Sequence, residues 1–186
     1  MTLSNCTITR NQCRVAYKIG TQDQGSSYGG GIEGSGTTVT NCTISHNVAA
    51  SGTPNIGDAA GGGIDGGATL TNTIVSNSGR AGNCSCGTTS GGHNLSSDAT
   101  CFSSGGSDRL STNPHLAPLG NYGGATQTMA LCTGPGNPRA SCTAASPAID
   151  AGDDAVTGPP DNLSTDQRGL PRLSGAHVDI GAYEVQ

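Results

Sequence analysis

Two carboxylates occupy equivalent places in the sequence, and their spacing makes them the first candidates for chemistry. Glu33 follows the run Gly29–Ile32, and Asp65 follows the same Gly-Gly-Gly-Ile motif where it ends at Ile64. If each such interval is one structural unit, the two acids lie on neighbouring units about 5 Å apart, which is the separation that a retaining glycosidase uses. They could also share a cation, or be two solvated acids.

The composition weighs against a sugar-cleaving role for this pair. A glycosidase needs aromatic side chains that stack on sugar rings, and the chain has one Phe and four Tyr. A pectate-lyase-type reaction needs a Ca²⁺ cluster beside an Arg or Lys base, and no basic residue stands near either acid in the sequence. We therefore expect a protein that is not an enzyme. A polysaccharide lyase, a glycosidase or a carbohydrate-binding module is the alternative.

Internal repeats predict the elements that would position these acids. Three segments begin at Leu3, Val39 and Leu70, and their first Asn residues are spaced by 36 and then 31 positions. The Gly-Gly-Gly-Ile motif recurs after 32 positions, so the two motifs keep one period. Apolar and polar residues alternate within each segment, and no 3.6-residue pattern is sustained. The sequence thus predicts an all-β protein, a right-handed parallel β-helix with long loops and no substantial helices.

The repeats also predict which side chains point inward. We expect Leu3, Cys6 and Ile8 to face the interior with their counterparts, and the asparagines of the bend to form an internal ladder of amides (Asn5, Asn41, Asn72). The threonines beside them should stack on the outer face (Thr7, Thr43, Thr73). An exposed threonine face resembles those of ice-binding β-solenoids, which is a third functional hypothesis, although threonine is also common on any exposed strand.

Eight cysteines in a chain with one Lys favour an oxidising, extracellular setting. Cys132 and Cys142 bracket a Gly/Pro-rich loop, and we predict a disulfide between them. One local bridge is expected among three others (Cys84, Cys86, Cys101). Cys6 and Cys42 are expected to stack as small apolar side chains, and a redox pair is the less favoured interpretation.

Charge and hydropathy exclude several functions. The eight basic residues are scattered and the formal net charge is −5, so we expect no nucleic-acid partner. No apolar run approaches the length that spans a bilayer, so we expect no membrane insertion. The spacing of Cys and His residues is wrong for zinc, and Asp150 with Asp153 is weak support for Ca²⁺, so we expect no metal and no cofactor.

Four C-terminal segments have a more specific pattern: Asn113–Leu131, Ser146–Gly152, Asp166–Arg172 and Asp179–Glu184. They resemble the C-terminal signature of the choice-of-anchor Q proteins, bacterial surface proteins related in pattern to polymorphic outer-membrane proteins, whose β-helix repeats the motifs above also resemble. The resemblance implies a parallel β-helix, secretion and a surface or adhesive role without assigned chemistry. The polar residues of this signature are expected to be structural rather than catalytic (Asp150, Asp166, Arg168, Asp179, Glu184).

These observations predict one continuous domain, with β-helix coils over residues 1–110 and further coils and a cap over 111–186. We expect a non-enzymatic, structural or adhesive unit at the cell surface that contacts a polysaccharide or another surface ligand. The repeat begins at Leu3 with no room for a cap. Either an upstream part precedes it, or the first coil meets the end of another copy, which would build a filament.

Overall fold

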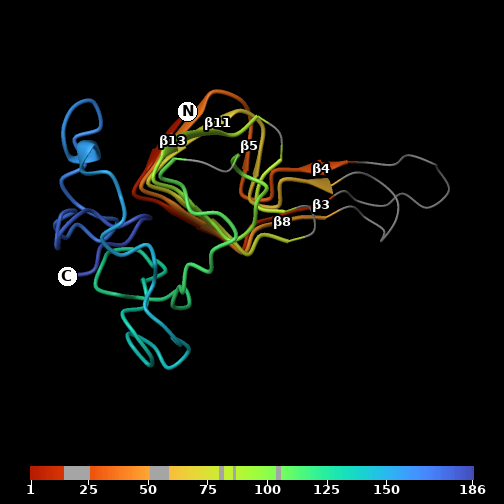
Figure 1. Cartoon of the computed structure of the whole chain (residues 1–186). Coiled ribbons are helices and arrows are strands. Elements are labelled where there is room, and N and C mark those ends of the chain that lie inside the picture. The colour runs from red at the N-terminus through yellow and green to blue at the C-terminus, as the bar shows by residue number, and fades with distance from the viewer. Residues whose placement is uncertain (15–25, 51–58, 80–81, 86, 104–105) are drawn as a thin grey trace.

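The computed structural model is a stack of parallel β-coils with a long C-terminal segment packed against its side (Figure 1). It describes residues 1–14, 26–50, 59–79, 82–85, 87–103 and 106–186. Every pairing between its named strands is parallel, which confirms the predicted parallel β-helix. Within these ranges the helical structure is limited to one short 3₁₀ turn, Asp154–Thr157, and no helix is long and apolar enough to cross a membrane.

In the described ranges, fourteen short strands make up four coils. The first coil contains β1 (Thr2–Ser4), β2 (Thr7–Thr9), β3 (Gln12–Arg14), β4 (Ser27–Tyr28) and β5 (Ile32–Glu33). The second contains β6 (Thr37–Thr40), β7 (Thr43–Ser45), β8 (Val48–Ala50), β9 (Ala59–Ala60) and β10 (Ile64–Asp65). The third has β11 (Ala68–Thr71) and β12 (Ile74–Ser76), and the fourth has β13 (Thr89–Gly92) and β14 (Leu95–Ser96). The two larger sheets run β1-β6-β11-β13 and β2-β7-β12-β14.

Apolar residues in register fill the inside of the stack. Alternation along each strand sends every second side chain inward, so equivalent positions on successive coils lie on top of one another. Three stacks result and form one core cluster: Leu3–Val39–Leu70, Ile8–Ile44–Val75 and Ile32–Ile64–Cys84. The architecture predicted from the repeats therefore holds for the interior.

The register of the third coil differs by one residue from the register expected by aligning the Thr-Ile pairs of the repeats. Thr43 pairs with Ile74 and Ile44 pairs with Val75, so Ile74 points outward while Val75 takes the interior place. The shared reference point is the bend, where Asn5, Asn41 and Asn72 all have a φ near +50°. Asn adopts this left-handed conformation more readily than most residues, so the bend rather than the Thr-Ile letters sets the register.

Of the predicted asparagine ladder at this bend, only the hydrogen bond between Asn72 and Asn41 forms. Asn72 Nδ2 donates to Asn41 Oδ1 at 3.3 Å, whereas Asn41 and Asn5 donate to backbone carbonyls of the C-terminal segment. Asn5 Nδ2 lies 2.7 Å from the Thr165 carbonyl oxygen, and Asn41 Nδ2 lies 3.1 Å from that of Asp179. The bend therefore binds another part of the chain instead of closing on itself.

Residues 111–186, here called the flanking segment, do not continue the coils. In this fully described range the structure has no named strand, only isolated bridges that are antiparallel and the 3₁₀ turn, so the expected C-terminal coils are a wrong prediction. The segment packs along the sheet β2-β7-β12-β14, where Ile74 and Leu95 form an apolar cluster with Leu131, Ala148 and Ile180. Outward apolar residues on this sheet need such a cover, which explains why the segment lies beside the stack.

Among the described cysteines, two disulfides join residues close in sequence. Cys132 is bonded to Cys142, as the sequence predicts, and Cys84 is bonded to Cys101. Cys86 lies outside the described residues. The second bond anchors the chain at the end of the stack, where residues 98–103 and 106–110 form what we call the cap. Phe102 in the cap is nearly buried and joins the interior cluster, while Arg109 pairs with Leu95 of β14.

Candidate functional site

The two acids predicted to be neighbours are neighbours. In the pairing of β5 with β10, Asp65 lies directly opposite Glu33. Glu33 is exposed, and the Asp65 carboxylate accepts a hydrogen bond from the Ser85 hydroxyl on the next coil. In the part of the chain that the structure describes, neither acid forms an ion pair, and no cluster of three His, Cys, Asp or Glu residues could hold a metal ion. Among the described residues, the pair thus has no charged partner.

Charged residues of the C-terminal signature form a buried network that holds the flanking segment (Asp166, Arg168, Arg172, Asp179, Glu184). Arg172 and Glu184 have no exposed surface, and Asp179 and Asp166 are 1% and 3% exposed. Arg172 donates to Asn5 Oδ1 on the first bend and, at 3.0 Å, to the Gly181 carbonyl oxygen. Such contacts join two parts of the fold and leave no surface for a substrate.

The same burial shifts the proton equilibria of this network. Removal from water raises the pKa of Glu184 to about 8 and that of Asp179 to about 6, because burial disfavours the charged carboxylate. Burial also lowers the pKa of Arg172, against the attraction of Glu184, whose Oε2 lies 3.8 Å from Arg172 Nη1. Arg168 is paired with Asp166 at 2.7 Å and stacks 3.7 Å from the centre of the Tyr183 ring.

A cavity of about 300 Å³ lies where the flanking segment meets the loop before β14. His177 Nδ1 lies 2.9 Å from Asp154 Oδ2, and His93 Nδ1 lies 3.0 Å from the Ala151 carbonyl oxygen. The hydrogen bond from His177, and a second one from the Val178 amide, lower the pKa of Asp154. Asp150 accepts hydrogen bonds from two backbone amides. The carboxylates are thus engaged by the fold, and the lining holds no Ser, Thr or Cys nucleophile.

The predicted outward threonine face is covered. Thr43 is buried, and its Oγ1 accepts the Ala182 amide at 3.1 Å. Thr73 is buried but does not lie on this face, because the register shift places it in line with Cys42, whose amide donates to Thr73 Oγ1. Thr7 Oγ1 lies 2.8 Å from Thr128 Oγ1 of the flanking segment. The prediction fails because residues more than a hundred positions away pack on this sheet, and the ice-binding hypothesis loses the surface on which it rested.

A different column of threonines is exposed on the neighbouring sheet, β1-β6-β11-β13. Its members are in register on four successive coils and are all exposed: Thr2, Thr38, Thr69 and Thr89. We call them the threonine column. Successive hydroxyls are one strand spacing apart, about 4.8 Å.

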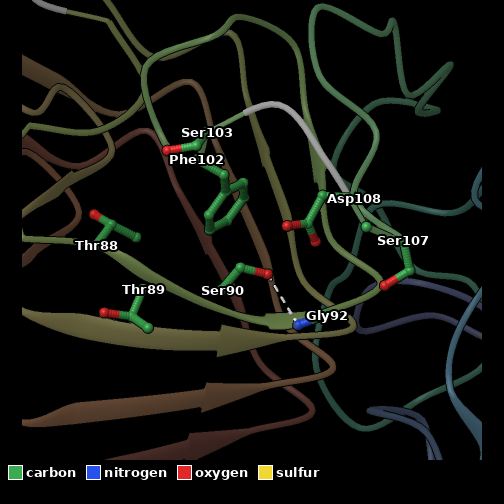
Figure 2. A pocket seen from close by; sticks show the side chains of 9 residues that line it. Thr88, Thr89, Ser90, Gly92, Phe102, Ser103, Ser107 and Asp108 are labelled. Atoms are coloured by element: carbon green, nitrogen blue, oxygen red, sulfur yellow. Dashed lines mark hydrogen bonds between the residues drawn. The ribbon is translucent and has the colours of Figure 1, made fainter.

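The column ends in a groove of about 530 Å³ between β13 and the cap. Figure 2 shows Phe102 extending from the cap over the strand that carries Thr89 and Ser90, with Ser107 and Asp108 on the other side. The Thr88 hydroxyl oxygen in its lining is buried, and no described residue bonds to it. Buried polar groups usually have a partner, so this oxygen is an open site for a hydrogen bond. The groove exists because the cap pairs with β14 and leaves the outer edge of β13 uncovered.

Sequence reasoning missed both the column and the groove. Residues 88–92, Thr-Thr-Ser-Gly-Gly, lack inward apolar residues, and their composition is typical of a loop. The available signal was the recurrence of Thr with the register of the first sheet, at positions 2, 38, 69 and 89.

Comparison with known proteins yields no relative. No protein-family model matches the chain, no curated protein matches it, and no solved structure matches its fold. The resemblance to choice-of-anchor Q proteins therefore stays a prediction that rests on the sequence motifs.

Proposed function

We propose that this chain is a non-enzymatic, extracellular adhesive β-solenoid that binds an extended, uncharged polysaccharide along the threonine column and in the groove at its end. The observation that carries the proposal is the groove itself. It combines the hydroxyls of Thr88, Thr89, Ser90 and Ser107 with an apolar surface from Phe102 and one carboxylate, Asp108. Sugar rings present both hydroxyls and apolar C–H faces, so this lining suits them.

The spacing of the column supports an extended chain rather than a single sugar. Hydroxyls about 4.8 Å apart recur at close to the length of one unit in an extended β-linked polysaccharide. Each threonine hydroxyl both donates and accepts, as the hydroxyls of a sugar do. No Arg or Lys lines the groove, so an uncharged polysaccharide suits it better than an acidic one.

The positions of the acidic residues favour polysaccharide binding without cleavage. Glu33 and Asp65 lie on β5 and β10, a separate sheet from the column, and line neither cavity. Of the carboxylates of the signature, Asp166, Asp179 and Glu184 are buried in the fold, and the exposed Asp150 accepts hydrogen bonds from two backbone amides. An extracellular location is supported by two disulfides and by a chain with a single Lys.

Retention on a panel of insoluble polysaccharides (cellulose, chitin, xylan, mannan) tests the proposal. Thr38→Val with Thr69→Val removes two hydroxyls and keeps the β-branched shape, so we expect affinity for the retained polymer to fall roughly tenfold. Glu33→Gln, an exposed change off the column, should bind like the parent protein, and neither should release reducing ends.

Three results would overturn this function. They are retention of no polymer, equal affinity in the double valine variant, or release of reducing ends that Glu33→Gln abolishes. A depression of the freezing point that the double valine variant loses would also contradict it and would identify an ice-binding face instead.

A further inference from the structure

Two thiols are stacked on successive coils at the first bend. The pairs Ser4–Thr40 and Thr7–Thr43 bracket them in register, so Cys42 lies directly above Cys6. The Cys6 amide donates to Cys42 Sγ at 3.4 Å. Each Sγ also lies near the carbonyl oxygen two residues before it, at 3.1 Å for Cys6 and 3.3 Å for Cys42. Neither cysteine is in a disulfide in this structure.

The two thiols differ in their surroundings. Cys42 in the second coil is fully buried, whereas Cys6 keeps part of its surface exposed. The hydrogen bond from the Cys42 thiol lowers the pKa of Cys6 to about 6, while the same bond and burial raise the pKa of Cys42. These surroundings therefore favour a thiolate on the accessible sulfur and a thiol on the covered one. Thiolates are the nucleophiles of disulfide exchange.

A buried cation stands at the same bend. Arg172 donates to Asn5, the residue before Cys6, and its positive charge favours ionisation of Cys42. Its Nε is buried and bonds to no described residue. The other charged groups that act on this guanidinium are the carboxyls of Glu184, Asp166 and Asp179. A cation beside the sulfurs favours the thiolate that the second sulfur must become during exchange.

We propose that Cys6 and Cys42 form a redox-active dithiol that exchanges with an external disulfide, with Cys6 as the attacking sulfur and Cys42 as the resolving one. This site is independent of the polysaccharide surface, because it lies at the bend between the first two sheets and shares no residue with the column or the groove.

The exchange balances in two steps. The Cys6 thiolate attacks one sulfur of the external disulfide, the S–S bond breaks, and one external thiolate leaves as a mixed disulfide forms on Cys6. Cys42 then loses its proton to the released thiolate, and its sulfur attacks Cys6 Sγ and expels the second external thiolate, which takes a proton from water. Two protein thiols are oxidised to one disulfide, and one external disulfide is reduced to two thiols.

A disulfide between Cys6 and Cys42 fits the spacing of the coils. Neighbouring parallel strands lie about 4.8 Å apart, and cysteines whose Cα atoms are about 4.4–6.8 Å apart can be bridged. The bond would tie the first coil to the second. Thr73 stands in the equivalent place of the third coil, with its hydroxyl donating to the Thr71 carbonyl oxygen at 2.9 Å, so the dithiol is confined to these two coils.

The experiment is oxidation of the full chain with oxidised glutathione, followed by digestion with trypsin without reduction. The cleavage sites place the three free thiols among the described residues on separate peptides: residues 1–10 carry Cys6, residues 11–14 carry Cys13, and residues 19–80 carry Cys42. We expect a linked peptide that joins 1–10 to 19–80. Cys42→Ser should instead accumulate glutathione on Cys6, because the resolving sulfur is gone.

Cys13 is the matched control, since it is also half-buried and free on the first coil but faces Ala49 rather than a thiol. With limiting iodoacetamide at pH 7 we expect Cys6 to be alkylated at least tenfold faster than Cys13. Cys42→Ala should lower that ratio because it removes the side-chain donor beside the Cys6 sulfur. The proposal is overturned if the link between 1–10 and 19–80 never forms, if Cys42→Ser carries no glutathione on Cys6, or if Cys13 reacts as fast as Cys6.

Discussion

Glu184 has its carboxyl group where water does not reach, and this position makes the stability of the protein depend on pH. Its pKa rises from 4.5 to about 8, chiefly because burial disfavours the charged form. Between these two values the folded chain holds a proton that the unfolded chain has lost, so the free energy of unfolding falls as pH rises and levels off above pH 8. Asp179, with a pKa of about 6, acts in the same direction at lower pH.

Glu184→Gln therefore should flatten this dependence. Between pH 6 and 8 we expect the free energy of unfolding of the parent protein to fall by up to about 1.4 kcal/mol per pH unit through this one proton. The variant should lack this dependence of stability on pH. It should also lose one hydrogen bond, because both carboxyl oxygens of Glu184 accept backbone amides and the glutamine side chain has only one oxygen that can accept. Denaturant unfolding across the range measures it. Glu33→Gln, exposed, should keep the parent slope, and equal slopes in all three proteins would contradict the assignment.

At this scale the sequence predicts pairs that share a motif and misses pairs that the fold makes from distant residues. Glu33 and Asp65 follow identical glycine-rich runs, so their contact could be predicted. The contact of Arg172 with Asn5 spans 167 positions and has no local pattern. The prediction that the outward threonines are exposed was wrong for the same reason. Alternation predicts which face of the sheet a side chain lies on, but not whether another part of the chain covers that face.

At the scale of elements, β7 and β12 carry an isoleucine on opposite faces of one sheet. Ile44 of β7 lies in the interior cluster, and Ile74 of β12 lies in the cluster with the flanking segment. Both are fully buried, so Ile44→Ala and Ile74→Ala should each cost about 2–5 kcal/mol of stability. They form a matched pair because the chemical change is the same.

The two variants should differ in where the chain opens. Hydrogen exchange and limited proteolysis of Ile74→Ala should show faster exchange and cleavage within residues 111–186 while the coils stay protected. In Ile44→Ala the coils themselves should lose protection. Identical patterns in both variants would mean that the flanking segment and the coils unfold as one unit, contrary to the separate clusters described above.

Strands could be predicted where a repeat and an apolar alternation coincide, as in β2, β7 and β12. The alternating pieces at residues 125–131, 148–150 and 178–185 satisfied the local pattern but form no coil, because a strand also needs a neighbouring coil to pair with. The opposite error occurred at β13, whose Thr89–Gly92 residues carry no apolar signal. It is a strand because β11 provides the pairing edge.

At the scale of the whole molecule, the last coil of a stack has unpaired backbone groups that must be covered. An uncovered rung is a template for strand addition, and end-to-end docking of copies would build a filament. Here the cap covers β14: Arg109 pairs with Leu95, and the Ser96 amide donates to the Arg109 carbonyl oxygen at 2.8 Å. The Cys84–Cys101 disulfide anchors the cap to the third coil, and Phe102 extends it into the core.

Removal of this disulfide should therefore increase association of the chain through its last coil. Cys84→Ala with Cys101→Ala opens a loop of 17 residues, which should cost about 3 kcal/mol of stability and release the cap from β14. Light scattering at increasing concentration should show the parent protein at one constant mass and the variant growing in mass. Cys132→Ala with Cys142→Ala is the matched control, because that bond lies in the flanking segment and in a different apolar cluster from Leu95 of β14. Growth in the parent protein, or in the control as much as in the cap variant, would show that the cap is not what protects the last coil.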